Sequence, residues 1–298
     1  MGGHMGRPAR NHRVRRFGAL LLALAALGVA TIAPAGAAPA QTPPASYVAL
    51  GDSYTSGPLI PNQSLNPLGC LRSDRNYPHV VAPATGQPAF RDVSCSGADT
   101  DDMFNAQGVT PGPNPPQLDA LDDNTRLVTL GIGGNDIGFS GIIQDCATLW
   151  PFGSPCRNRF VSGGVDQLSG RIAATAPKVA SVLTAIRSRS PQARVLVVGY
   201  PAILPDTGSG CWPSMPIAFN DVGYLRAKTK ELNAMLATQA AAHGATYVDT
   251  YTPGIGRDVC KSTGTRWVEP IIPGNLAAPV HPNARGEAGM AAAVRAAL

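Results

Sequence analysis

Short apolar runs recur along the chain and alternate with longer segments of helical periodicity. The runs are rich in Val, Leu and Ile and show no regular polar alternation. Continuous apolar strands that alternate with helices are typical of a parallel sheet buried on both faces. The pattern therefore predicts an α/β fold with a central sheet of about five strands. The expected strands are Tyr47–Leu50, Phe90–Ser94 (the weakest pattern), Arg126–Gly131, Arg194–Gly199 and Thr246–Val248.

Three longer segments carry the clearest helical patterns: Gly164–Arg189, Asn220–His243 and Ala284–Ala297. Asn283 directly precedes the last of them, and an asparagine side chain at that position can accept hydrogen bonds from the first free N–H groups of a helix. No internal repeat or charged linker interrupts the chain, so we expect these elements to form a single domain.

The first forty residues differ from the rest. Arginines precede the apolar stretch Phe17–Ile32, and small residues follow it, which is the order of a secretory signal peptide. The stretch is short for a membrane-spanning anchor. We expect residues 1–40 to be removed, with cleavage after Ala37 or Ala40, and residues 41–298 to be the exported domain. An adjacent pair of arginines leaves Sec and twin-arginine export both open.

The net charge of the chain comes from this leader. The full sequence has 24 Lys and Arg residues against 19 Asp and Glu residues, and residues 1–40 contain five arginines and no acid. Residues 41–298 are therefore formally neutral. A neutral chain has no overall field that attracts nucleic acid or an anionic membrane. We expect no nucleic-acid partner.

Six cysteines, an even number in a chain expected to be exported, predict disulfides. A metal site or a catalytic thiol is the alternative. Because the chain has no Cys-x-x-Cys pair and no histidine at ligand spacing, no metal is expected. Among the possible pairings we prefer the sequential one, in which each bridge closes a loop between regular elements. The expected pairs are Cys70–Cys95, Cys146–Cys156 and Cys211–Cys260.

The first predicted strand ends abruptly in a turn that contains a serine. Tyr47–Leu50 runs into Gly51-Asp52-Ser53, and Gly57 follows four residues later. Glycine allows backbone conformations that other residues resist, so the chain can turn sharply and present Ser53 at the carboxyl end of the strand. An ordinary turn is the alternative, because Gly, Asp and Ser are common turn residues. Ser53 is the candidate nucleophile.

A serine hydroxyl is too weakly acidic to attack unaided, so a nucleophilic Ser53 needs a general base. Residues 41–298 contain three histidines. His243 ends a long helix and His79 lies inside a short one, and both positions favour structural roles. His281 lies in a turn just before the terminal helix, where a rigid scaffold can hold a base. His281 is the candidate base.

Two further turns follow predicted strands and offer donors for an oxyanion, the negative oxygen that forms on an attacked carbonyl. Gly97 follows the second strand and can expose its backbone N–H, while Asn135 follows the third and can donate its side-chain amide. The backbone N–H of Ser53 is a third donor. We interpret Asp52 and Asp136 as carboxylates that fix their turns by accepting backbone N–H bonds.

With these residues in this order, the chain resembles the SGNH, or GDSL, hydrolase family. The matching residues are Gly51-Asp52-Ser53, Gly97, Gly133-Gly134-Asn135-Asp136 and His281. The resemblance spans nearly all of residues 41–298, and the six-cysteine layout resembles that of secreted esterases and lipases of Gram-positive bacteria. It implies a three-layer α/β/α flavodoxin-like fold. It also implies Ser53 as nucleophile, His281 as base, and Ser53, Gly97 and Asn135 as the oxyanion hole.

One position departs from the family pattern. The family usually has an Asp three residues before its histidine, where this chain has Ala278. Some secreted relatives are understood to orient the histidine with a backbone carbonyl, which here would belong to Ala278 or Pro279. Such a carbonyl can fix the tautomer of His281 but lacks the charge that stabilises imidazolium. We therefore predict a Ser–His dyad, with Asp258 or Glu269 as the alternative orienting carboxylate.

The resemblance implies a secreted serine esterase or lipase that hydrolyses esters of lipids or other acyl groups through an acyl-Ser53 intermediate. No cofactor is expected, because the chain has no nucleotide-binding or metalloprotease motif. A carbohydrate O-acetyl esterase, a phospholipase A and a non-catalytic binding protein are the alternatives. We expect an ester substrate, a monomer and no membrane anchor after removal of the leader.

Two segments, Trp150–Arg159 and Ile203–Ile217, fit neither helical nor strand periodicity. Each mixes apolar side chains, including tryptophan, with Pro, Gly and one cysteine. Ligands of open parallel sheets bind beyond the carboxyl ends of the strands, where such loops gather. Their aromatic side chains either line a groove for an acyl chain or form a hydrophobic plug fastened by a disulfide.

Overall fold

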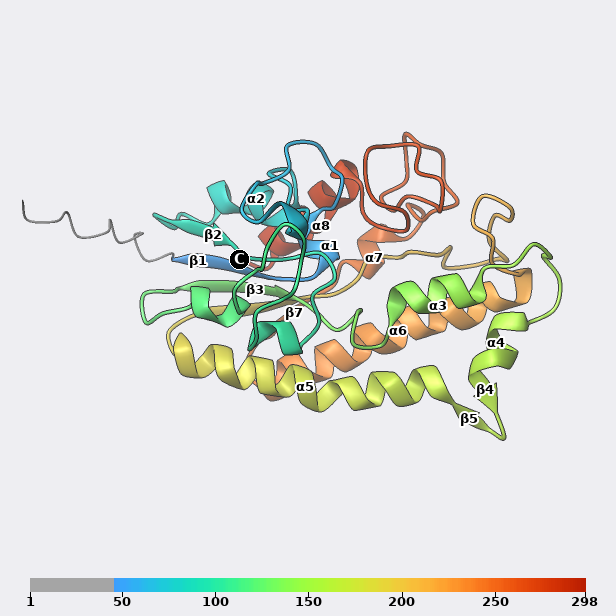
Figure 1. The fold of residues 1–298 in the computed structure, drawn as a ribbon, viewed down its shortest axis with the longest axis horizontal. Coiled ribbons are helices and arrows are strands. Elements are labelled where there is room, and N and C mark those ends of the chain that lie inside the picture. The colour runs from blue at the N-terminus through green and yellow to red at the C-terminus, as the bar shows by residue number, and fades with distance from the viewer. Residues whose placement is uncertain (1–45) are drawn as a thin grey trace, which may run out of the picture. The chain divides into compact units, whose positions relative to one another are not determined.

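The computed structural model describes residues 46–298, in which a five-stranded sheet carries helices on both faces (Figure 1). The sheet order is β2-β1-β3-β6-β7, and every neighbouring pair of strands is parallel. The predicted α/β class and the three-layer arrangement are therefore confirmed. The strands are β1 (Tyr47–Gly51), β2 (Phe90–Asp92), β3 (Leu127–Gly131), β6 (Arg194–Val198) and β7 (Thr246–Val248).

Each strand contributes side chains to two apolar layers, because successive residues of a strand point to opposite faces. In β1, Val48 and Leu50 belong to the larger layer, and Tyr47 and Ala49 belong to the smaller one. Figure 1 shows two long helices below the sheet and two shorter ones above it. The larger layer is covered by α5 (Gln167–Arg189) and α6 (Phe219–Ala242), and the smaller by α2 (Tyr77–Val81) and α8 (Ala284–Ala296).

The observed element boundaries follow the predicted ones closely, with one instructive exception. As expected, Asn283 caps α8, its side chain accepting from the N–H groups of the second and third helical residues. Helix α5 begins at Gln167 rather than Gly164. Gly163 and Gly164 have φ angles of 58° and 80°, which suit a tight turn and not a helix. They form the turn of a small antiparallel hairpin, β4 (Val161–Ser162) and β5 (Val165–Asp166).

The connections contain short helical segments that the sequence pattern did not resolve. Most are four to eight residues long, or single turns of 3₁₀ helix, which are too short to establish a helical period. The α-helices are α1 (Ser53–Ser56), α3 (Phe139–Cys146), α4 (Pro155–Phe160) and α7 (Tyr251–Gly254). The 3₁₀ turns are η1 (Leu68–Cys70), η2 (Ala82–Ala84), η3 (Asp101–Met103) and η4 (Gln117–Ala120).

The strand order reverses between β1 and β3, because the chain passes from β1 to one side of the sheet and then crosses to the other. Open α/β sheets bind ligands beyond the carboxyl ends of the strands at such a point. Gly51 pairs with Gly131 in the register, so β1 and β3 end at the same level. The turns that follow these strands therefore lie next to each other.

Three disulfides join the cysteine pairs expected from the sequence. The leader, residues 1–40, lies outside the described residues, and so do the expected cleavage positions after Ala37 and Ala40. In the part of the chain that the structure describes, no helix is both long enough and apolar enough to cross a membrane.

Candidate active site

Ser53 is the first residue of α1 and lies directly beyond the carboxyl end of β1. Asp52 caps the helix, its carboxylate accepting the N–H of Tyr54 at 2.8 Å. Glycine is required at position 51 because Thr55 and Gly131 lie too close for a side chain. A Cβ atom there would collide with Thr55 Oγ1 and lie 2.7 Å from the carbonyl oxygen of Gly131. The sharp turn that presents Ser53 thus depends on the absence of a side chain at Gly51.

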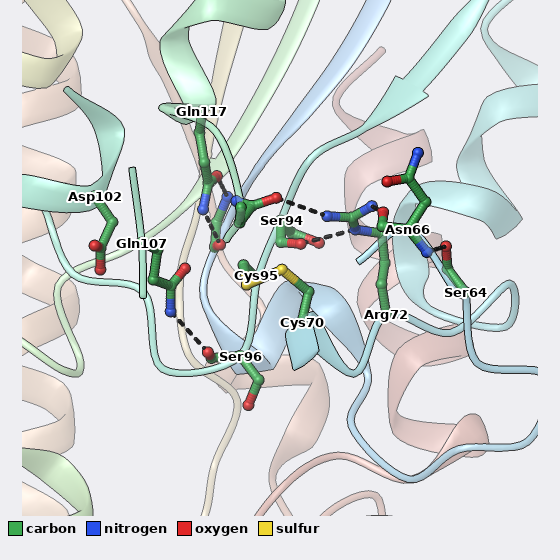
Figure 2. The surroundings of a disulfide bond; sticks show 12 residues. Ser64, Asn66, Cys70, Arg72, Ser94, Cys95, Ser96, Asp102, Gln107 and Gln117 are labelled. Carbon is green, nitrogen blue, oxygen red and sulfur yellow. Dashed lines mark hydrogen bonds between the residues drawn. A yellow bond between two sulfur atoms is a disulfide. The ribbon is translucent and has the colours of Figure 1, made fainter. Parts of the chain in front are cut away.

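A buried glutamine, Gln117, also holds this turn, through hydrogen bonds to the backbone of Gly51. Gln117 Oε1 accepts the N–H of Gly51 at 2.8 Å, and Gln117 Nε2 donates to the Gly51 carbonyl at 2.9 Å. Gln117 has no exposed surface, so both backbone groups of Gly51 are satisfied without water. Figure 2 shows Gln117 beside Cys95 and the disulfide. Sequence reasoning missed Gln117, because it lies in a loop with no recognisable motif.

The turn that carries Gly97 is fixed by the Cys70–Cys95 disulfide and its surroundings (Figure 2). Ser96 N donates to Cys70 O at 2.9 Å, and Gln107 Nε2 donates to Ser96 O at 2.9 Å. Gly97 adopts a φ angle of 83°, in the region that glycine enters freely. Its backbone N–H has no hydrogen-bond acceptor among residues 46–298, and the residue is exposed. The Gly97 N–H is therefore free to donate a hydrogen bond to an oxygen of a ligand.

Asn135 lies in the turn after β3, where its side-chain Nδ2 donates to Ala98 O at 2.7 Å. An amide nitrogen has two N–H groups, so one of them remains for a ligand. Asp136 accepts the N–H of Thr100 at 3.1 Å. The loops after β2 and β3 are thus joined, which brings Gly97 and Asn135 to the same side of the site. The interpretation of Asp136 as a turn-fixing carboxylate agrees with these contacts, as does that of Asp52 above.

His281 lies opposite Ser53, with its Nε2 2.8 Å from Ser53 Oγ and its Nδ1 2.7 Å from the carbonyl oxygen of Pro279. Of the two candidate carbonyls, that of Ala278 or of Pro279, the ring nitrogen therefore contacts that of Pro279. A carbonyl only accepts, so Nδ1 carries the proton and Nε2 is free to accept from the serine hydroxyl. Burial lowers the pKa of His281 below its ordinary value, and the bond to Pro279 opposes that shift only in part.

The two carboxylates considered as alternatives are directed elsewhere. Glu269 Oε2 accepts from Arg266 Nη2 at 2.7 Å, and Oε1 accepts from Asn283 Nδ2 at 2.6 Å. Burial by itself would raise the pKa of Glu269, but these donors outweigh it and lower the pKa to about 2. Asp258 is buried and accepts the N–H of Cys260 at 3.0 Å. Glu269 therefore builds the loop that carries His281 and does not contact the imidazole ring.

The backbone beside His281 is strained. Val280 has a φ angle of 60°, which is a genuine outlier for a β-branched residue. Two hydrogen bonds hold it there: Tyr54 Oη donates to Val280 O at 2.6 Å, and Val280 N donates to Glu269 O at 3.0 Å. The ring centroid of Tyr54 lies 5.0 Å from that of His281. Tyr54 thus connects the helix of the nucleophile with the loop of the histidine, a link that sequence reasoning missed.

Tyr200 is the second tyrosine that sequence reasoning missed. Its hydroxyl donates to Asp52 Oδ2 at 2.5 Å. Burial raises the pKa of Asp52 to about 7, although the hydrogen bonds from Tyr200 and Tyr54 N act to lower it. Tyr200 follows β6 by two residues. The rule that polar residues after strand ends gather at one site, which predicted Gly97 and Asn135, applies equally to this strand.

A largely apolar pocket opens beside Ser53. It lies between α3, the start of α5, the middle of α6 and the loop after β6. Trp150, Phe152 and Trp212 are absent from its lining, and Trp150 and Phe152 are exposed at the surface. The expectation that aromatic residues of the two irregular segments either line a groove or form a plug is therefore wrong for Trp150 and Phe152. The main apolar lining residues are Ile142, Ile143, Leu168, Ile203, Leu204 and Leu225.

Comparison with known proteins identifies the fold and the reaction class. The profile of the GDSL-like Lipase/Acylhydrolase family matches residues 49–288. The chain belongs to this family. Lipase 2 of Streptomyces coelicolor is 46% identical over 276 residues, which cover 89% of this chain and 90% of that protein. The resemblance inferred from the sequence blocks is thereby confirmed, and the chain is a carboxylic ester hydrolase of the lipase and esterase type.

Two solved structures of the family show the same architecture. The phospholipase A1 of Streptomyces albidoflavus NA297 superimposes with a TM-score of 0.71 at 28% identity, covering 84% of this chain and 98% of that one. The extracellular lipase of Streptomyces rimosus gives a TM-score of 0.72 at 29% identity, covering 85% and 100%. These likenesses extend over most of this chain and almost the whole of the two solved structures.

Proposed function

We propose that the protein is a secreted lipase that cleaves acyl esters through a covalent intermediate on Ser53, with His281 as its only catalytic partner side chain. The 2.8 Å contact between Ser53 Oγ and His281 Nε2 carries this proposal, because a serine becomes nucleophilic when an adjacent base takes its proton. Residues 41–298 form the exported enzyme after removal of the leader, and the three disulfides are typical of an oxidising compartment.

The reaction proceeds in two steps. Ser53 Oγ attacks the ester carbonyl carbon while its proton moves to His281 Nε2, and the carbonyl oxygen becomes an oxyanion. The N–H groups of Ser53 and Gly97 and the amide of Asn135 stabilise that oxyanion. His281 then gives its proton to the leaving alcohol, which leaves the acyl group on Ser53. In the second step His281 takes a proton from water, the hydroxide attacks the acyl carbon, and Ser53 regains its proton as the acid departs.

The donor geometry supports the oxyanion role. Ser53 is the first residue of α1, and the first N–H groups of a helix have no acceptor within the helix. The Gly97 N–H is equally unoccupied within residues 46–298. Removal of a single oxyanion donor typically lowers kcat by about 10²–10³-fold. We therefore assign a large part of the rate enhancement to these three donors.

The lining of the pocket favours a lipid acyl chain over an acetyl group. Apolar side chains continue from Ser53 along α3 and into the space between α5 and α6. Each buried methylene group contributes about 0.8 kcal/mol to binding, so esters with longer acyl chains bind more tightly. A carbohydrate O-acetyl esterase would not use this length of apolar wall. Phospholipase A activity remains the second candidate, because the wall suits a phospholipid acyl chain equally well and a phospholipase A1 shares this fold.

The test is a panel of p-nitrophenyl esters from acetate to palmitate, together with phosphatidylcholine, measured on wild type and on Ser53→Ala. We expect kcat/KM to rise with chain length and Ser53→Ala to lose activity by about 10⁴-fold or more. Ser56→Ala is the matched control, because Ser56 lies one helical turn away and its hydroxyl has no hydrogen-bond partner. A steep fall beyond acetate would exclude the lipase assignment. Failure of a fluorophosphonate to modify Ser53 would exclude the acyl-enzyme mechanism.

A further inference from the structure

A single phenol oxygen joins two turns of the site that are far apart in the sequence. The hydroxyl of Tyr200 donates to Asp52 Oδ2 at 2.5 Å and accepts the N–H of Gly134 at 2.7 Å. A backbone N–H can only donate, so the tyrosine proton is directed at the carboxylate. Asp52 immediately precedes Ser53, and Gly134 immediately precedes Asn135. The bridge therefore connects the turn of the nucleophile with the turn of an oxyanion donor.

Tyr200 is itself held firmly. Its backbone N–H donates to Asn233 Oδ1 and its carbonyl accepts from Asn233 Nδ2, each at 2.8 Å. Its ring packs edge-on against Tyr54 with centroids 5.1 Å apart. Only 4% of the residue is exposed, so water does not compete for the hydroxyl. The position of the phenol oxygen is thus set by α6 and by the ring contacts, independently of the two turns that it joins.

The fit between Tyr200 and Gly134 is close. A Cβ atom on Gly134 would lie 2.9 Å from the phenol oxygen and 3.1 Å from the ring carbon that bears it. Position 134 is therefore glycine because a side chain there would block the approach of the Tyr200 hydroxyl to the backbone. Asn135 in turn donates one amide N–H to Ala98 O. The side chain of Asn135 is thus held by Ala98, and the backbone of the preceding residue, Gly134, is held by Tyr200.

We propose that Tyr200 is a positioning residue, whose hydroxyl fixes the Gly134–Asn135 turn, and with it the Asn135 amide, at a set distance from Ser53. The proposal rests on the proposed role of Asn135 as an oxyanion donor. Tyr200 does not touch the reacting atoms; it acts through Asp52 and Gly134. A displacement of about 1 Å in a catalytic group can cost 10²-fold in rate. The bond to Tyr200 therefore matters more for the transition state than for substrate binding.

The test compares Tyr200→Phe with Tyr47→Phe. Tyr47 is also fully buried and its hydroxyl makes one hydrogen bond, to Thr129 at 3.1 Å, but its side chain belongs to the opposite apolar layer. Each variant removes one buried hydroxyl, which makes two hydrogen bonds at Tyr200 and one at Tyr47. Rates are expressed per active site titrated with a fluorophosphonate, so that misfolded molecules do not count. We expect Tyr200→Phe to lower kcat about tenfold or more with KM within about twofold, and Tyr47→Phe to keep the wild-type kcat.

A double-mutant cycle separates positioning from general stability. If Tyr200 acts through Asn135, the Tyr200→Phe change costs little once Asn135→Ala has removed the donor, and the two losses in kcat do not multiply. Losses that multiply, or a Tyr200→Phe enzyme with the kcat of Tyr47→Phe, would overturn the proposal. A wild-type kcat for Asn135→Ala would overturn the oxyanion assignment itself, so the two failures are distinguishable.

An isosteric variant covers the case in which Tyr200→Phe does not fold. Asp52→Leu keeps the shape of the side chain but has no acceptor for Tyr54 N or Tyr200 Oη, both of which donate to the carboxylate. The bridge from Tyr200 to the serine turn is then lost. We expect the same selective loss of kcat. An Asp52→Leu enzyme with wild-type kcat would contradict the proposal as clearly as a Tyr200→Phe enzyme with wild-type kcat.

Discussion

The two halves of the Ser–His pair are held in different ways. Ser53 lies at the end of a central strand, and its turn is fixed by backbone contacts with β3, by a helix cap and by the clamp from Gln117. His281 lies in a connection with no regular strand or helix between α7 and α8. Its loop is organised around the buried carboxylate of Glu269, whose backbone also pairs with His281. The serine is positioned by the sheet and the histidine by a cluster of polar side chains.

The buried carboxylates of these two regions, Asp52 and Glu269, differ in the charge of their hydrogen-bond partners. Asp52 has one tyrosine hydroxyl and one backbone N–H as partners, and burial raises its pKa to about 7. Burial also favours a raised pKa at Glu269, but a guanidinium and several amide donors lower its pKa to about 2. Only Glu269 is therefore firmly ionised in the folded enzyme at neutral pH. The histidine loop thus depends on charge, whereas the serine turn depends on steric fit and on hydrogen bonds from neutral groups.

The largest expected effect comes from breaking the steric fit of the serine turn. Gly51→Ala places a methyl group against Thr55 and the Gly131 carbonyl. We expect the free energy of unfolding to fall by about 3 kcal/mol and kcat to fall by about 10²-fold, measured by denaturation and ester hydrolysis. Gly170→Ala in α5 is the control, because nothing lies within 4 Å of its Cβ position. A Gly51→Ala enzyme as active as this control would show that the turn tolerates strain.

An effect on stability alone is expected from neutralising the histidine loop. Glu269→Gln removes the charge opposite Arg266, which is only 8% exposed, and breaking a buried pair costs about 3 kcal/mol. Because the folded-state pKa of Glu269 lies below its ordinary value of 4.5, the wild-type contribution is present above pH 4.5 and is lost as the pH falls toward 2.

We therefore expect the free energy of unfolding, measured with urea between pH 2 and pH 4.5, to fall less on acidification in Glu269→Gln than in wild type. Glu231→Gln serves as the control, since the side chain of Glu231 is 38% exposed and its ion pair with Lys228 is therefore partly hydrated. Equal acid dependence in wild type and Glu269→Gln would mean that the loop does not rely on this charge, and the contrast between the two regions would fail.

The smallest effect is a shift in pH dependence. His281 acts as a base only when neutral, and its pKa is lowered by burial, so we expect the acid limb of kcat/KM to have its midpoint below 6.5. Ala278→Asp restores the family's usual acid at the position three residues before the histidine. A carboxylate there favours imidazolium, so the midpoint should rise by about one pH unit or more. Ala278→Asn controls for side-chain size. An unchanged midpoint in Ala278→Asp would place the new carboxylate out of reach of the ring.

The sequence predicted the regular parts of this molecule well, because apolar strands and long helices impose a period on the residues. Ser53, Gly97 and Asn135 could be chosen because they follow strand ends, where a parallel sheet gathers its loops. Their catalytic roles, and that of His281, remain predictions. Tyr200 follows the same rule and was overlooked, since tyrosine is also an ordinary core residue.

Other features could not be predicted from the sequence. The direction of the Glu269 carboxylate depends on Arg266 and Asn283, whose positions are set by a loop without periodicity. The exposure of Trp150 and Phe152 was unexpected for the same reason, because aromatic composition gives no indication of which way a loop turns. Side-chain contacts made across irregular segments carry no local signal.

The acceptor that faces Nδ1 of His281 belongs to the main chain, and this has a consequence for how the enzyme tolerates mutation. Every amino acid at position 279 carries a carbonyl group, so no single substitution deletes the atom that orients the ring. Substitutions that disturb the orientation of His281 are therefore expected at the residues that hold this backbone in place, Tyr54 and Glu269. In a lineage without the usual acid, inherited loss of function at the histidine should therefore map to side chains that make no hydrogen bond to its ring.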